Sequence, residues 1–283
     1  LRIIQDKLTQ KQFLADNGIP TAPFEAVESP TPEQFAAFGY PLVQKARRGG
    51  YDGRGVAILK TPEDFDQHLP VPSLIERFVE ADKEIAVLVA RNTKGEVATY
   101  APVEMCFRAG ENVLDLLLAP ADIDDATQAE AEAIAIKTVE SLDGVGIFGV
   151  ELFLSHDGEI LVNEIAPRTH NSGHHTIEAN VTDQFEQHLR AILGLPLGST
   201  ATLCPAAMLN LLGAPGETGR PVIRGLEETL AIPGVCLHLY GKGETRPFRK
   251  MGHITVLDPD RHRARAKALQ VRDTIEIGAE ESA

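Results

Sequence analysis

Two apolar stretches, residues 149–154 and 160–166, flank the dipeptide Asp157-Gly158, which is typical of a two-residue β-hairpin turn. A turn centred there pairs Glu151 directly with Glu164 across two antiparallel strands. Carboxylates paired in this way lie about 5 Å apart and repel each other, and an unpaired charge beside apolar neighbours is costly. We therefore expect a positive group between them, and Mg²⁺, which binds carboxylates together with nucleotide phosphates, fits this position. The alternative is a solvated hairpin whose two glutamates point to water.

A glycine-rich, basic segment separates two further predicted strands, residues 41–45 and 56–59. Residues 45–55 contain four glycines and four lysines or arginines. Glycine lets backbone N–H groups approach a phosphate closely, and the basic side chains supply charge. The segment therefore predicts a loop that covers phosphates, although it lacks the GxxxxGK[ST] pattern of a P-loop. The alternative is a flexible basic hairpin loop.

The chain is acidic, with 41 Asp and Glu residues against 27 Lys and Arg residues and a formal net charge of −14. This balance argues against a protein held to nucleic acid or to an anionic membrane by a general basic surface. No apolar run approaches the roughly 18 residues that span a bilayer. We expect a cytoplasmic protein with no nucleic-acid or membrane partner, in which any phosphate is bound by local basic groups.

The order of predicted elements indicates an α+β protein, and 283 residues suffice for about two domains. Residues 6–14 read as a helix already under way, and longer apolar strands begin at Ser73. Residues 125–142 predict an amphipathic helix capped by Asp124, with an apolar stripe. The members of that stripe are Ala129, Ala133, Ile136 and Val139. The GxGxxG pattern at 144–149 follows this helix and opens a strand, which is the wrong context for a dinucleotide-binding turn.

Two more polar clusters are candidate binding groups. Arg168 and His170 follow a predicted strand and suit an anion such as bicarbonate or phosphate, or His170 is a structural histidine. Residues 242–250 contain four basic side chains in nine positions and suit a phosphate ester, or form a solvated hairpin.

Three motifs resemble the 5-(carboxyamino)imidazole ribonucleotide synthase family of ATP-grasp enzymes. They are KARRGGYDGRG at 45–55, Glu-x-x-Val at 76–79 followed by Glu84, and NEIAPRTHNSGH at 163–174. The resemblance implies an α+β ATP-grasp fold with a small lid domain, a larger and mainly antiparallel domain and a C-terminal β-rich subdomain. The implied bounds are 9–75, 76–194 and 195–283, with residues 1–8 as the remnant of a missing N-terminal domain. Residues 105–107, Met-Cys-Phe, depart from the more polar stretch of many relatives.

The resemblance also implies roles for individual residues. The expected ATP-binding residues are Lys7, Lys45, Gly50, Tyr51, Asp52, Gly53, Arg54, Gly55, Val56, Glu76, Arg77, Phe78, Val79, Glu84, Asn163 and Glu164. Glu151 and Glu164 would carry Mg²⁺, in agreement with the hairpin argument. The expected substrate-binding residues are Tyr51, Arg168, Lys242 and Arg249, and the expected catalytic residues are Arg168, His170, Tyr51 and Asp52.

The activity implied by the resemblance is carboxylation of 5-aminoimidazole ribonucleotide by ATP and bicarbonate through carboxyphosphate, in purine biosynthesis. A homodimer is expected for the full-length family. Two alternatives stay open: another ATP-grasp ligase, or an ATP-binding fragment that is inactive without an N-terminal domain.

Overall fold

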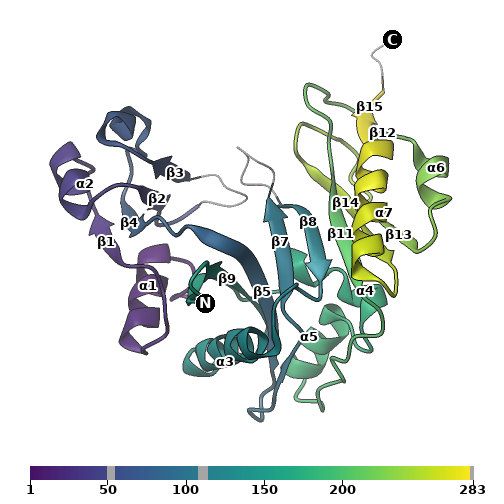
Figure 1. Cartoon of the computed structure of the whole chain (residues 1–283), viewed down its shortest axis with the longest axis horizontal. Helices are drawn as coiled ribbons and strands as arrows, with labels where there is room; N and C mark the ends of the chain where they lie inside the picture. The colour runs from purple at the N-terminus through teal and green to yellow at the C-terminus, as the bar shows by residue number, and fades with distance from the viewer. Residues whose placement is uncertain (50–54, 108–113, 281–283) are drawn as a thin grey trace.

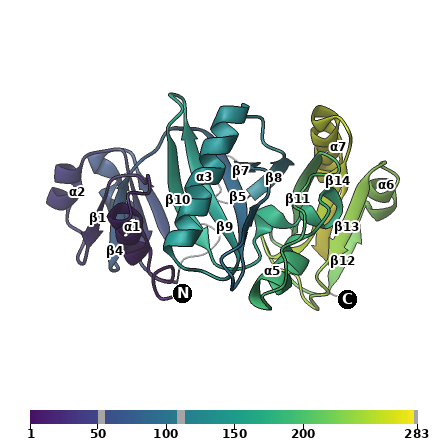
Figure 2. The ribbon, with the colours of Figure 1, turned by 90° about the horizontal axis from the view of Figure 1, so that it is seen from below.

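The structure is a computed structural model that describes residues 1–49, 55–107 and 114–280. Its elements form three groups along the chain, which lie from left to right in Figure 2. The first group contains α1 (Lys7–Asp16), β1 (Phe24–Val27), α2 (Pro32–Phe38), β2 (Leu42–Ala46), β3 (Val56–Leu59), a 3₁₀ helix (Pro62–Gln67) and β4 (Ser73–Arg77). Its strands form an antiparallel sheet in the order β1–β4–β2–β3.

Alternation along β2 gives this small sheet two different faces. Leu42 and Gln44 are buried, whereas Val43 and Lys45 are only partly buried. The buried face packs on α2 through a core of Val27, Phe35, Leu42, Leu59 and Ile75. The opposite face is therefore left to line the space between this sheet and the next group.

The second group begins a large sheet. It contains β5 (Ala81–Arg91), β6 (Val97–Thr99), β7 (Val103–Phe107), β8 (Leu114–Ala119), α3 (Asp125–Ser141), β9 (Gly146–Ser155), β10 (Ile160–Ala166), a 3₁₀ turn (Asn171–Gly173), α4 (Thr176–Ala179) and α5 (Gln184–Ile192). The core between α3 and the sheet includes Val87, Val89, Val139, Val150 and Leu152. Figure 1 shows α3 below the sheet and the small sheet to its left.

The third group extends the same sheet. It contains β11 (Ala206–Leu212), β12 (Pro221–Arg224), α6 (Leu226–Leu230), β13 (Val235–Leu239), β14 (Lys250–Leu257), α7 (Arg261–Thr274) and β15 (Glu276–Ala279). The strand order is β10–β9–β5–β7–β8–β11–β14–β13, with β6 beside β5, and β12 pairs separately with β15. Every named strand pair is antiparallel, which confirms the α+β prediction.

Two predictions about helices need correction. Helix α3 has the expected bounds and its Asp124 cap, but Ala129 and Ala133 are exposed and Ile136 is only partly buried. The buried stripe is Ala131, Ala135, Thr138 and Val139, because alanines occur on both sides of this helix and carry little directional signal. Helix α1 begins at Lys7 rather than continuing from earlier residues, since the Asp6 side chain accepts hydrogen bonds from Leu8 N and Thr9 N.

Candidate active site

A cleft of about 570 Å³ lies between the free face of the small sheet and the adjoining face of the large sheet. Every predicted ATP or metal residue that the structure describes lines this cleft, except Gly55. These residues are Lys7, Lys45, Val56, Glu76, Arg77, Phe78, Val79, Glu84, Glu151, Asn163 and Glu164. Chain segments separated by more than a hundred residues therefore meet at one place.

The two glutamates of the β9–β10 hairpin are opposed as expected. Glu151 is the register partner of Glu164. The turn, however, is not the predicted two-residue turn: Ser155 N donates to Glu159 O at 2.9 Å, so the loop has three residues, and Gly158 has φ +87°. A β-bulge between Val162 and Glu164 then shifts the register by one residue and restores the opposition.

Each of these carboxylates has a cationic or ionisable partner. Lys7 Nζ donates to Glu164 Oε2 at 2.7 Å, and His170 Nε2 lies 3.2 Å from Glu151 Oε1. Burial raises the pKa of Glu151, but hydrogen bonding to His170 and the charges of His170, Lys7 and Lys45 outweigh it and hold that pKa below its usual value. Glu151 is therefore kept ionised, in the form that binds a cation.

A second ionic group joins β2, β4 and α1. Lys45 Nζ donates to Asn163 Oδ1 at 2.8 Å and to Glu76 Oε2 at 3.1 Å. Lys11 Nζ reaches the same Glu76 oxygen at 3.4 Å from inside the protein. The sequence analysis did not select Lys11, and nothing in the local pattern of α1 marks it as buried.

Glu84 lies on β5, on the same side of the sheet as Glu151. Its register partner on β9 is Phe153, while Glu151 is paired with Ala86. Burial, and then repulsion from Glu151, raise the pKa of Glu84 to about 7. The carboxyl group therefore changes charge near neutral pH and suits a hydrogen bond with hydroxyl groups.

Apolar side chains complete the cleft. Val43 and Ile58 come from the small sheet, and Phe107 and Phe153 from the large one. Val43 lies two residues from Lys45, and Ile58 two residues from Val56, so strand alternation places each pair on one face of the sheet. No motif in the sequence marks Val43 or Ile58. Phe107 is the last residue of β7. These side chains provide apolar walls for a flat ligand.

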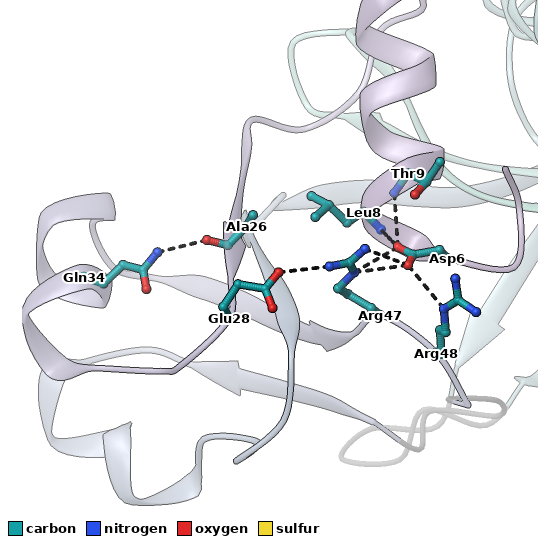
Figure 3. A network of polar contacts seen from close by, with 8 residues as sticks. All are labelled: Asp6, Leu8, Thr9, Ala26, Glu28, Gln34, Arg47 and Arg48. Carbon is teal, nitrogen blue, oxygen red and sulfur yellow. Dashed lines mark hydrogen bonds and ion pairs between the residues drawn. The ribbon is translucent and has the colours of Figure 1, made fainter.

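The start of the glycine-rich segment is tied down by ion pairs (Figure 3). Arg47 Nη2 lies 2.9 Å and Arg48 Nε 3.3 Å from Asp6 Oδ2, and Arg47 Nη1 lies 3.0 Å from Glu28 Oε1. Together with Lys45, which pairs with Glu76, three of the four basic residues expected to face phosphates are thus engaged by acidic side chains. Gly50, Tyr51, Asp52, Gly53 and Arg54 lie outside the described residues.

The loop after β10 brings His170 against β9. The His170 side chain is 10% exposed, its Nδ1 lies 2.8 Å from Ser172 Oγ, and Gln184 Oε1 accepts from its backbone N at 2.8 Å. A Cβ on Gly149 would lie 2.7 Å from His170 Cγ, so only glycine leaves room for the ring. Arg168 is exposed and donates to Thr169 O at 3.0 Å.

Lys242 and Arg249 do not line the cleft. Lys242 Nζ donates to Lys250 O at 2.6 Å and lies 5.6 Å from the Tyr240 ring centre, and Arg249 Nη1 donates to Glu244 O at 2.8 Å. Both lie in the segment that connects β13 to β14, and the structure does not bring them into direct contact with the carboxylate pair.

A histidine stack joins that region to the loop after β10. The ring of His253 stacks on His174 at 4.6 Å and on His238 at 4.4 Å, and Tyr240 Oη lies 3.0 Å from His253 Nδ1. Gln184 links the stack to the His170 loop, since its Nε2 lies 3.1 Å from His174 Nδ1 and donates to His170 O at 2.9 Å. A continuous polar path therefore runs from the carboxylate pair toward Lys242.

Family models match two parts of the chain. The ATP-grasp domain model matches residues 12–185, and the model named phosphoribosylaminoimidazole carboxylase C-terminal domain matches residues 206–267. A crystal structure of N5-carboxyaminoimidazole ribonucleotide synthetase from Thermotoga maritima is 53% identical, with a TM-score of 0.92 over 99% of this chain and 74% of that one. This chain belongs to that family of ATP-grasp proteins.

Other members of the family show which ligands one relative holds and how much of each relative this chain spans. The N5-carboxyaminoimidazole ribonucleotide synthase of Synechococcus elongatus is 45% identical over 89% of this chain and 64% of its own length. The synthase of Aspergillus clavatus, solved in complex with ADP and 5-aminoimidazole ribonucleotide, is 35% identical, with a TM-score of 0.86 over 96% of this chain and 73% of that one. The chain thus spans less than two thirds of the Synechococcus relative, and 46% of the phosphoribosylaminoimidazole carboxylase of Candida glabrata.

The described residues contain no group of three or more His, Cys, Asp or Glu side chains arranged to hold a metal ion by themselves. A pair of carboxylates that shares a cation with nucleotide phosphates needs no such group. No described helix has the length and apolar character required to cross a membrane.

Proposed function

We propose that this chain binds ATP in the cleft and uses it to carboxylate 5-aminoimidazole ribonucleotide with bicarbonate. The observation that carries the proposal is the convergence of Glu151, Glu164, Lys7 and Lys45 in a cleft that the 76–79 segment also lines. Basic groups and paired carboxylates suit a triphosphate, and apolar walls suit a purine. Family membership and the ligands of the Aspergillus clavatus relative support the same substrates.

Mg²⁺ is part of this proposal. Glu151 and Glu164 face each other on one side of a hairpin, and hard carboxylate oxygens are the ligands this ion prefers. The residues present therefore fit the ion, which would neutralise phosphate charge during transfer when bound. Lys7 and His170 each hold one of the two carboxylates in place.

The chemistry needs positioning and charge neutralisation rather than a protein nucleophile. An oxygen of bicarbonate would attack the γ-phosphorus of ATP, forming a P–O bond and releasing ADP. The resulting carboxyphosphate would transfer its carboxyl group to the exocyclic amine of the ribonucleotide, releasing phosphate and a proton. Lys7 and Lys45 would hold the phosphates, and Arg168 and His170 would hold the anionic intermediate.

Further roles also belong to the proposal. Gly50–Val56 would cover the phosphates, Glu84 would bind the ribose, and Tyr51, Asp52, Lys242 and Arg249 would handle the ribonucleotide. The lid, large and C-terminal parts would span 9–75, 76–194 and 195–283. We also infer a cytoplasmic enzyme of purine biosynthesis that forms a homodimer, which light scattering of the purified protein would test.

The test is phosphate release from ATP and bicarbonate, measured with and without 5-aminoimidazole ribonucleotide. We expect release that the ribonucleotide stimulates, and its loss in Glu164→Ala. Glu159→Ala, an exposed glutamate near the tip of the same hairpin, is the matched control and should behave like the parent.

The comparison of lengths supports a second outcome as well. Because the chain spans only part of its relatives, it could bind ATP without turnover. Nucleotide binding with no phosphate release would identify this case, whereas absence of both would refute the proposal.

A further inference from the structure

Helix α5 buries two polar side chains and exposes apolar ones. Gln184 and Gln187 are fully buried, whereas Phe185 and Leu189 on the same helix are 41% and 55% exposed. A buried side-chain amide is costly unless its oxygen and its N–H groups find partners. The partners of the two amides therefore show what each glutamine does.

The Gln184 amide bonds both sides of the His170 backbone. Its Oε1 accepts from His170 N at 2.8 Å, and its Nε2 donates to His170 O at 2.9 Å. The loop makes room for the amide at Gly173, where a Cβ would lie 2.5 Å from Gln184 Oε1. The loop after β10 is therefore anchored at the residue whose ring contacts Glu151.

The same amide determines which nitrogen of His174 carries a proton. A backbone N–H only donates and a carbonyl only accepts, so the bonds to His170 identify Gln184 Nε2 as a donor. That nitrogen lies 3.1 Å from His174 Nδ1, which must therefore accept. Burial, and then the charge of His170, lower the pKa of His174 to about 4. Near neutral pH the ring is thus neutral, with its one proton on Nε2.

His170 carries the anchoring on to the carboxylate pair. Ser172 N donates to His170 Nδ1 at 3.3 Å, so Nε2 holds the ring proton and lies 3.2 Å from Glu151 Oε1. The ring passes over Gly149, where a Cβ would collide with it. It reaches Glu151 only while the His170 backbone keeps its place. Loss of a partner that orients a metal ligand from behind typically weakens metal binding about 10- to 100-fold.

We propose that Gln184 is a positioning residue for the cation site: with one amide it bonds the His170 backbone and the His174 ring, and so keeps His170 Nε2 on Glu151. This inference rests on the proposed binding of ATP with Mg²⁺. Gln184 contacts neither the nucleotide nor the cation in this assignment. It acts through His170, which fixes the orientation of the Glu151 carboxylate.

Gln187 shows what a purely structural role looks like. Its Oε1 accepts from Gly198 N at 2.8 Å and its Nε2 donates to Gly198 O at 2.9 Å, so it bonds a backbone residue in the same way as Gln184. Gly198 does not line the cleft. Methionine at either position removes two hydrogen bonds to the backbone from a fully buried place. A role confined to stability therefore predicts similar effects for the two replacements.

The test measures how much Mg²⁺ strengthens nucleotide binding. A fluorescent ATP analogue is titrated into the purified full chain with Mg²⁺ and with excess chelator, and the ratio of the two dissociation constants gives the contribution of the cation. We expect Gln184→Met to lower this ratio by about tenfold, whereas Gln187→Met should keep the ratio of the parent. Urea unfolding should show similar losses of stability in the two variants.

A double variant tests the route of the effect. Adding Gln184→Met to His170→Ala should lower the ratio no further than His170→Ala alone, because Gln184 acts through His170. An additional loss in the double variant would contradict that route.

A second measurement needs no variant of Gln184. Nuclear magnetic resonance of the parent with ¹⁵N-labelled histidine reports which ring nitrogens carry protons, and comparison with His174→Phe identifies the His174 signals. We expect a bare Nδ1 and a protonated Nε2 in His174 at pH 7. A protonated Nδ1 would show that the Gln184 amide does not donate to this ring and would overturn the inference, even if Gln184→Met fails to fold.

The remaining outcomes are distinct. Equal ratios in Gln184→Met and Gln187→Met would overturn the inference and leave the proposed function intact. A parent that binds the analogue equally with and without Mg²⁺ would overturn the inference while ATP binding stands. A parent that binds no nucleotide would instead refute the proposed function, and this inference with it.

Discussion

Lys7, the first residue of α1, forms an ion pair of 2.7 Å with Glu164 of β10, although the two residues are 157 positions apart in the sequence. Their side chains are 17% and 47% exposed, so water screens the pair. A partly exposed ion pair contributes at most about 1 kcal/mol to folding. In the proposed function, Lys7 therefore contributes mainly its charge toward the ATP phosphates.

Replacing Lys7 with methionine separates these two contributions. We expect the ATP concentration for half-maximal phosphate release to rise by about tenfold, because one charge-assisted hydrogen bond to phosphate is lost. Urea unfolding should shift by less than about 1 kcal/mol. Lys94→Met, at the exposed β5–β6 turn, should change neither quantity. A large loss of stability with unchanged ATP dependence would contradict this assignment.

Gly149→Ala should displace His170 from Glu151. The added methyl group would lie within 3 Å of three His170 ring and Cβ atoms, and overpacking of this kind costs about 1–3 kcal/mol. We expect lower stability in urea and strongly reduced phosphate release. Gly149→Ala/His170→Gly removes the ring and the Cβ, so its stability should exceed that of the single variant, while activity stays low. If the double variant is less stable than the single one, the steric explanation is wrong.

Acid should destabilise the protein through its buried histidines. Burial lowers the pKa of His174 and His175 to about 4 and that of His253 to about 3. The unfolded chain binds protons near pH 6.5 whereas the folded chain does not, so these groups favour folding above that pH and the benefit is lost as pH falls toward 4. Urea unfolding measured from pH 7.5 to 5 should show this loss.

A variant of the stack tests the source of this pH dependence. His253→Phe keeps an aromatic ring between His174 and His238 but binds no proton. The slope of the free energy of unfolding against pH should decrease by the amount that corresponds to about one bound proton. His262→Phe, on the exposed face of α7, should leave the slope unchanged, and an unchanged slope in His253→Phe would exclude the stack as its source.

Asp6 has two separable roles, as the cap of α1 and as the partner of Arg47. Asp6→Asn keeps a capping oxygen but loses the ion pairs, whereas Asp6→Ala loses both and should be less stable by about a further 1 kcal/mol. Asp124→Ala removes only a helix cap, so its loss of stability in urea unfolding gives the size of a capping contribution alone. Equal stability of the two Asp6 variants would show that the cap contributes nothing.

Local signals predicted much of the fold. The Asp124 cap of α3 acts within one turn, so the sequence around it determines where this helix begins. Burial of a particular face depends on the partner surface. For that reason Ala129, Ala133 and Ile136 of the predicted α3 stripe are not buried, whereas Val139 is.

Contacts between distant segments were harder to predict. Lys11 is surrounded by polar residues in the sequence, and only the packing of α1 against β4 and β10 buries it. Arg47 and Arg48 have the composition of a phosphate loop, but both form ion pairs with Asp6, about forty residues away in the sequence. The family motifs located the cleft because they record such long-range proximity, which composition and periodicity do not.

The three-residue tip of the β9–β10 hairpin and the bulge at Asn163 depend on each other. With a two-residue tip and a regular ladder, Glu164 would still oppose Glu151, but Asn163 would point to the far side of the sheet. With the longer tip and no bulge, Glu164 itself would change sides. The added loop residue and the added strand residue together place Asn163 and Glu164 on the same side of the sheet. The Asn163 amide then reaches Lys45, and the Glu164 carboxylate reaches Lys7. Shortening the loop by one residue would therefore disturb the chemistry of a cleft that the loop itself does not line.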